Sequence, residues 1–180
     1  MKRIRAFLTD ASGEAAIEFV FVFPIIFLIF TAAFESSMFM AKAAMLDRAV
    51  DLTVRQLRLG NFTNPTHEKV KQTICRSGVM MESLSDCMQS MKVWMQPINT
   101  ANFTMAAPPR SCVDKRQPIS TDEPPANEFA VGTDNDIMLM RVCMKEDPIF
   151  PTTAVSTKMP VDPDGNYVML VTTTFVNEPG

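Results

Sequence analysis

Four cysteines and one isolated carboxylate are the residues of this 180-residue chain whose types and spacing suggest chemistry. The cysteines are separated by 12, 25 and 31 residues and include no CxxC pair, which does not favour a zinc site. We therefore expect disulfides and no metal. Four cysteines permit three pairings. A local bridge between Cys75 and Cys87 would join two neighbouring predicted helices and would leave Cys112, in a Pro-rich loop, to pair with Cys143 on a strand.

The isolated carboxylate is Glu18, the one charge in the apolar run of residues 15–34, AAIEFVFVFPIIFLIFTAAF. A carboxylate moved toward a bilayer centre costs on the order of 2.5–3.5 kcal/mol, so something should compensate it. Glu18 either reaches water at the cytoplasmic interface or pairs with a free α-amino group on a neighbouring subunit. Cleavage after Gly13 would create such a group on Glu14, with Glu18 as the fifth residue of the mature chain. The preceding glycine and the basic leader favour the second interpretation.

The apolar run is about the length that a helix needs to cross a bilayer. Lys2, Arg3 and Arg5 precede it against a single acid, Asp10, and positive charges on short flanks stay on the cytoplasmic side. This predicts a cytoplasmic amino terminus and an extracytoplasmic remainder, where the cysteines can be oxidised.

Three processing patterns are compatible with such a start. A secretory signal could be cut at Ala41-Lys42-Ala43, but the apolar run exceeds the usual ~7–15 residues and this site lies well beyond its end. The other two are an uncleaved anchor and a leader, residues 1–13, removed on the cytoplasmic side. The glycine before the run and the glutamate five residues after it favour the leader.

At these residues the sequence resembles a known family. Gly13, Glu14, Glu18 and Phe19 are similar to the G/xxxxE(F or Y) processing site of type IV-like prepilins. The continuation SGEAAIEFVFVFPIIFLIF, followed by a long helix with Glu35, more closely resembles the TadE-like minor pseudopilins of the tight adherence (Tad/Flp) pilus system, as does the closing FVNEP. The resemblance covers residues 12–59 and this tail, and it departs from many type IV pilins at the acidic Glu14.

The resemblance implies a minor pseudopilin for assembly or priming of an adhesive pilus, cut after Gly13 by a prepilin peptidase. Glu18 and Phe19 would align subunits. The expected location is the bacterial inner membrane, single-pass, with a periplasmic carboxy-terminal domain; incorporation into the pilus is left open. The implied partners are membrane lipid, other Tad pseudopilins including TadF-like ones, the major Flp pilin, and the inner-membrane assembly platform.

A long helix should carry the apolar run outward. Residues 14–36 are expected to span the membrane, and residues 37–60 to continue as an amphipathic stem that ends at Gly60. Pro24 should bend this helix, because its ring leaves the carbonyl of Val20 without an intrahelical donor. The stem has an apolar stripe that should pack on the rest of the chain, rather than on a dedicated partner: Phe39, Ala43, Leu46, Val50, Val54 and Leu57.

Residues 61–180 are expected to form an extracytoplasmic α+β cap. One short helix should open with Asn64 as N-cap and Pro65 at its first position, and end before Gly78; a second should place Met80 and Met91 on one face. A Pro-rich irregular loop, 97–136, follows a first strand, 92–96. Two more strands, 137–144 and 167–176, complete a small antiparallel sheet of about three strands against the stem helix.

The composition argues against several function classes. A net charge of −3 gives no electrostatic reason for nucleic-acid binding, and a single histidine leaves little for a His-based relay. The chain shows no glycine-rich phosphate loop and no nucleophile motif, so we expect neither an enzyme nor a cofactor. The alternative to a pseudopilin is an uncleaved single-pass membrane-anchored extracytoplasmic binding protein; an extracytoplasmic enzyme is the least favoured class.

Overall fold

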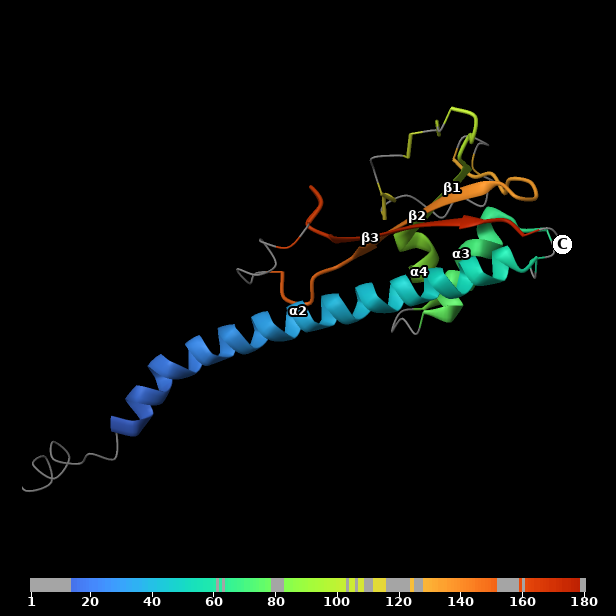
Figure 1. The fold of residues 1–180 in the computed structure, drawn as a ribbon. Helices are drawn as coiled ribbons and strands as arrows, with labels where there is room; N and C mark the ends of the chain where they lie inside the picture. The colour runs from blue at the N-terminus through green and yellow to red at the C-terminus, as the bar shows by residue number, and fades with distance from the viewer. Residues whose placement is uncertain are drawn as a thin grey trace, which may run out of the picture.

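The fold is described from a computed structural model, which combines one long helix with a small α+β cap (Figure 1). It describes residues 14–60, 62, 64–78, 83–102, 104–105, 107–108, 112–115, 124, 128–151, 159 and 161–178. The predicted leader, including Gly13, lies outside these residues. The elements in chain order are α2 (Glu14–Arg58), α3 (His67–Ser77), α4 (Leu84–Ser90), β1 (Met91–Pro97), β2 (Ile137–Glu146) and β3 (Tyr167–Val176). The predicted α+β fold is confirmed.

Helix α2 runs unbroken for 45 residues through Pro24. Its axis changes direction in the amino-terminal part, which contains that proline (Figure 1). The helix ends where Gly60 adopts a left-handed conformation, φ +64°, which an L side chain rarely adopts. The amino-terminal half of α2 stands free of the cap, whereas the carboxy-terminal half lies along it (Figure 1).

The core of the cap forms where the distal half of α2 meets the sheet. Leu46, Ala49, Val50 and Val54 are buried, which confirms that the apolar stripe packs on the same chain. They join alternate residues of the strands in one hydrophobic cluster. Methionine fills much of it, as suits an unbranched side chain that adapts to irregular gaps; the fully buried ones are Met91, Met95, Met138, Met140 and Met144.

The sheet is antiparallel with the order β1-β2-β3, so β2 is its central strand. Val142 pairs with Val93 on one side and with Val171 on the other. Helices α2, α3 and α4 lie on one side of the sheet (Figure 1), and the described part of the β1–β2 connection runs along the β1 edge, where the Met95 N–H donates to Glu128. This connection adds a short parallel bridge at Met95 and Phe129. The predicted strands are confirmed.

Two details of the short helices differ from the expectations. The N-cap of α3 is Thr66, whose hydroxyl accepts from the backbone N–H of Lys69 at 3.3 Å; Asn64 instead adopts φ +52° and turns the chain before the helix. Helix α4 ends at Ser90, because Met91 already has an extended conformation and begins β1. Met80 lies outside the described residues.

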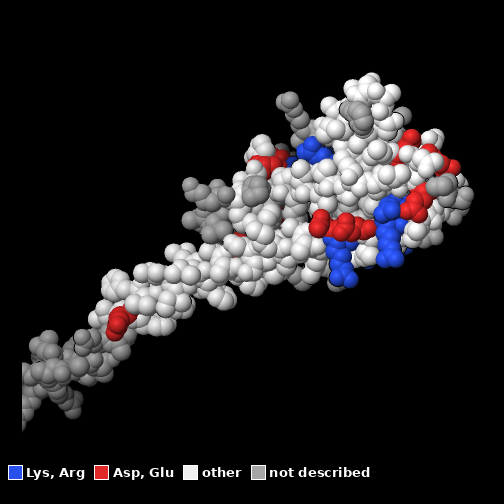
Figure 2. Space-filling view, viewed as in Figure 1, with Lys and Arg blue, Asp and Glu red and all other residues white. Residues whose placement is uncertain are grey.

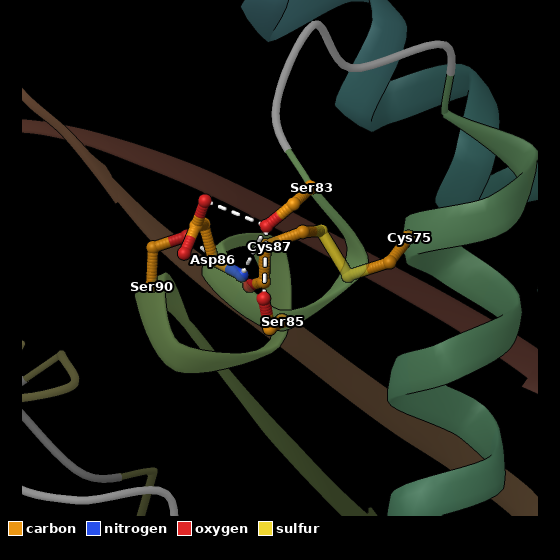
Figure 3. The surroundings of a disulfide bond; sticks show 6 residues. All are labelled: Cys75, Ser83, Ser85, Asp86, Cys87 and Ser90. Atoms are coloured by element: carbon orange, nitrogen blue, oxygen red, sulfur yellow. Dashed lines mark hydrogen bonds between the residues drawn. A yellow bond between two sulfur atoms is a disulfide. The ribbon is translucent and has the colours of Figure 1, made fainter.

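The structure contains the disulfides Cys75–Cys87 and Cys112–Cys143, one of the three pairings open from the sequence. The first joins α3 to α4 beside the α4 N-cap, where Ser83 accepts from the Asp86 N–H at 3.2 Å (Figure 3). The second fastens the β1–β2 connection to β2 across 31 residues of chain.

Removal of the longer disulfide should release this connection. The double change Cys112→Ala and Cys143→Ala is expected to lower the free energy of unfolding by about 3–4 kcal/mol, because a long closed loop restricts the unfolded chain. Limited proteolysis should then cut within residues 97–136. The matched control, Cys75→Ala with Cys87→Ala, leaves the connection fastened. Equal cleavage of the connection in both double variants would contradict this prediction.

Candidate functional site on the stem helix

The amino-terminal part of α2, up to Phe30, exposes apolar side chains around its whole circumference. Within the described part of the chain, the helix over Ala16–Arg58 is the one long and apolar enough to cross a membrane. A helix that is hydrophobic on every side and not covered by protein is suited to lipid. The exposed large side chains of this half are Ile17, Phe19, Val20, Phe21, Val22, Phe23, Ile25, Ile26, Phe27, Leu28, Ile29 and Phe30.

Glu18 is exposed on this half of the helix, within its first two turns. In the space-filling view a single acidic group stands on the otherwise uncharged part of the stem, while the other charges gather over the cap and the distal end of α2 (Figure 2). Among the described residues, no hydrogen bond or ion pair involves Glu18. Any group that compensates its charge inside a membrane therefore comes from outside this set of residues.

Phe19 begins a row of stacked aromatic rings along α2. Its ring centroid lies 5.1 Å from that of Phe23, which in turn lies 5.9 Å from that of Phe27. The spacing of four residues places all three rings on one face of the helix. This face offers a preformed apolar surface to lipid or to a neighbouring helix, next in sequence to Glu18.

Glu35 forms the junction between stem and cap, a contact that the sequence did not predict. Its side chain is buried, 2% exposed. One carboxylate oxygen accepts from the backbone N–H of Ile149 and the other from that of Phe150, each at 3.0 Å. A carboxylate held by backbone N–H groups makes strong, charge-assisted hydrogen bonds. A second glutamate at the outer end of the apolar run was the available signal, because carboxylates near a membrane span need a partner.

Three further contacts surround Glu35, and we call the group the stem clamp. Phe34 and Phe150 meet edge to face at 6.3 Å, and Phe39 and Tyr167 do so at 5.3 Å. Lys42 forms a largely buried ion pair with Glu146. The space left beside Glu35, Phe39 and Tyr167 is only about 10 Å³. The stem clamp therefore fixes both ends of the β2–β3 connection on two successive turns of α2.

The last residues of the β2–β3 connection are in addition tied back to β2. Lys145 pairs with Asp162 at 2.6 Å, and the Asp162 carboxylate accepts from the N–H of Asn166 at 2.8 Å. Although burial alone would raise it, these contacts hold the pKa of Asp162 at about 2. The sequence Asp162–Asn166 is therefore a turn that starts β3, as its proline and glycine favoured.

Tyr167, the single tyrosine of the chain, reports on the stem clamp. Burial and then the nearby Glu35 carboxylate raise its pKa to about 12. The hydroxyl is buried and meets no hydrogen-bond partner among the described residues, so the neutral form is favoured.

A pH titration should show this shift. In the folded protein, the absorbance change of tyrosine ionisation is expected near pH 12, against about 10 for an unfolded chain. The raised pKa contributes stability that is complete below pH 10 and is lost as the pH rises toward 12. In Glu35→Gln the ionisation should move to lower pH. Ionisation of folded wild-type protein at the ordinary tyrosine pKa would contradict the clamp geometry.

A surface depression lies at the distal end of the cap, away from the exposed amino-terminal part of α2. It encloses about 450 Å³ between α2 and β3 and is lined by both signs of charge, among them Asp51, Arg55, Arg58 and Glu178. Arg58 and Glu178 form an exposed ion pair of 2.8 Å across it. No cluster of three or more metal-binding side chains occurs in the described part of the chain.

Comparison with known proteins places the stem in a family context. Residues 13–55 match the family model of TadE-like proteins. The matched segment contains Gly13, Glu18, the bare half of α2 and the α2 residues of the stem clamp. Searches of the curated proteins and of the solved structures found no match. The resemblance noted in the sequence is confirmed over the matched segment, where this chain is similar to TadE-like proteins.

Proposed function

We propose that this protein is a minor pseudopilin that takes part in assembly or priming of a Tad/Flp type IV-like pilus for adhesion. The observation that carries the proposal is the TadE-like match over residues 13–55, which includes the spacing of Gly13 and Glu18. The structure adds support, because Glu18 lies exposed on a bare apolar helix while the cap is held away from it. This arrangement leaves the amino-terminal half of α2 available to lipid and to other subunits.

The proposed location is the bacterial inner membrane, with residues 14–36 crossing it once. The basic residues before the helix favour a cytoplasmic amino terminus, and the two disulfides suit a periplasmic cap. The proposed partners are other Tad pseudopilins, the major Flp pilin and the assembly platform, with a prepilin peptidase acting first. Glu18 and Phe19 would align neighbouring subunits.

Amino-terminal sequencing or intact mass of the membrane-extracted protein tests the proposal. The protein should be prepared with and without a prepilin peptidase. With the peptidase, the mature chain is expected to begin at Glu14. A chain that still begins at Met1 would favour the uncleaved anchored binding protein, with the distal depression as its ligand site. A chain that begins at Ala44 would indicate a secreted protein.

Gly13→Ala should block processing, since a prepilin peptidase that reads glycine before the cut would meet a side chain there. The expected result is full-length protein in the membrane and no product beginning at Glu14, measured by intact mass. Gly78→Ala is the matched control, because Gly78 has an ordinary φ of −77° at the end of α3, far from the processing site. Normal cleavage of Gly13→Ala would contradict the assigned site.

A further inference from the structure

The turn at residues 147–151 meets α2 where the bare half of the helix ends. In Figure 1 the β2–β3 connection descends from the sheet and touches α2 there. Its sequence is Asp-Pro-Ile-Phe-Pro. The Glu35 carboxylate accepts from both N–H groups that this Pro-Ile-Phe-Pro stretch can donate, those of Ile149 and Phe150. Proline has no N–H, so residues 148–151 keep no backbone donor without an acceptor.

A backbone segment without orphan donors enters an apolar medium at a lower cost than a turn whose N–H groups are also unpaired, and at an interface its carbonyl groups can still face water. The side chains match this property. Ile149 is 45% exposed, and Phe150 packs edge to face on Phe34, which is itself exposed on the stem. The charged residue of the turn, Asp147, pairs with Lys115 at 2.9 Å on the side of the cap. The turn thus presents isoleucine outward and keeps the N–H groups of Ile149 and Phe150 bonded to Glu35.

The depth of the turn follows from helix geometry. From Ala16 to Glu35 an α-helix rises about 28 Å, close to the ~30 Å of a bilayer hydrocarbon core. Thr31, one turn nearer the amino terminus, is only 3% exposed, so α2 is already covered by protein about 6 Å inside its apolar run. Because the turn is bonded to Glu35, which lies inside the expected span of residues 14–36, it lies at the outer end of the membrane-spanning segment.

We propose that the turn 147–151 is an interfacial anchor, with Ile149 inserted at the outer boundary of the lipid hydrocarbon. Glu35 is then a positioning residue that allows a polypeptide turn to lie at that depth. The cap contacts the membrane at a point separate from α2, which fixes its rotation about the helix axis. This inference rests on the membrane placement of α2 in the proposed function, and not on a role in pilus assembly.

Tryptophan fluorescence of the full chain in phosphatidylcholine–phosphatidylglycerol vesicles tests the anchor, with lipids brominated in the upper acyl chain as quenchers. Ile149→Trp is the probe variant. Val176→Trp is the matched control, because Val176 is 43% exposed at the distal end of β3, and Ile26→Trp marks the membrane span. The native Trp94 is buried in the sheet and gives the same background in all three.

Ile149→Trp should lose most of the emission of the added tryptophan if its indole ring lies at the ~5–10 Å depth of interfacial segments. Ile26→Trp should also lose most of the emission of its added tryptophan. Because each variant has two tryptophans, the loss is about half of its total emission. Val176→Trp should lose little. Quenching of Ile26→Trp without quenching of Ile149→Trp would overturn the anchor alone. If neither Ile149→Trp nor Ile26→Trp is quenched, α2 does not lie in the membrane, and the membrane location in the proposed function is contradicted as well.

A measurement on the unsubstituted protein guards against misfolding of the Ile149 variant. In nanodiscs that contain a headgroup spin label, the methyl NMR signal of Ile149 should broaden at high lipid-to-protein ratio, and that of Val176 should not. If the Ile149 methyl signal stays sharp at that ratio, the turn does not contact lipid and the proposal is overturned. The same result is expected if a second protein subunit, rather than lipid, covers the turn.

Discussion

Glu35→Ala is expected to lower the free energy of unfolding by about 2–6 kcal/mol, because two backbone N–H groups lose their acceptor at about 1–3 kcal/mol each. The groups are those of Ile149 and Phe150, which bond to opposite oxygens of the carboxylate. Alanine leaves no group at this position that could replace either bond. The loss should be visible in urea unfolding of the detergent-solubilised protein, and limited proteolysis should then cut between β2 and β3.

Two variants control this experiment. Glu35→Gln keeps one acceptor oxygen but places an NH₂ group toward the other N–H, so its stability should fall between those of wild type and Glu35→Ala. Glu18→Ala removes an exposed carboxylate from the same helix and should change stability by less than about 0.5 kcal/mol. If Glu35→Ala unfolds like Glu18→Ala, the two hydrogen bonds do not hold the cap to the stem.

Local patterns predicted much of the fold. The side chains of β3 largely alternate between more buried and more exposed positions, and its observed bounds, Tyr167–Val176, agree with the predicted strand. The stripe of α2 identified the buried face of the stem because helical spacing is a local property. The cysteine pairing was open among three arrangements, and the placement of α4 beside α3 decides it by bringing Cys75 to Cys87.

The role of Glu35 could not be predicted in this way, because its partners lie 114 and 115 residues further along the chain. No spacing rule relates a helix residue to the amides of a turn at that separation. The predicted N-cap of α3 was wrong for a different reason. Asn64 and Thr66 are both good N-cap types, and the left-handed backbone at Asn64 leaves Thr66 as the N-cap. Hydropathy placed the outer end of the membrane segment at residue 36, but apolar sequence alone does not distinguish lipid from protein around Thr31.

Glu18→Ala should have the opposite effect to Glu35→Ala: the protein should fold normally but fail to assemble into pili. In a pilus subunit, Glu18→Ala is expected to leave cleavage after Gly13 and the stability of the cap unchanged, because no described residue of the same chain bonds to its carboxylate. At the bilayer centre an unpaired carboxylate costs about 2.5–3.5 kcal/mol, which is an upper bound for Glu18 in the first two turns of α2, and pairing with a neighbour's α-amino group on association would recover this cost. Loss of that pairing would weaken association by at most about 100-fold per contact, since about 1.4 kcal/mol is tenfold.

The expected measurement is a large fall in surface pili together with weaker co-purification of partner pseudopilins. Intact mass in the same cells should still give a chain that begins at Glu14. Glu18→Asp is the matched control, because it keeps the charge and shortens the side chain by one methylene, so part of the assembly should return. Full pilus formation by Glu18→Ala would refute the alignment role, and failure to cleave it would mean that the peptidase rather than a neighbouring subunit reads Glu18. A variant that folds, is cleaved and fails to assemble places the need for this carboxylate between subunits, where the single chain leaves it exposed.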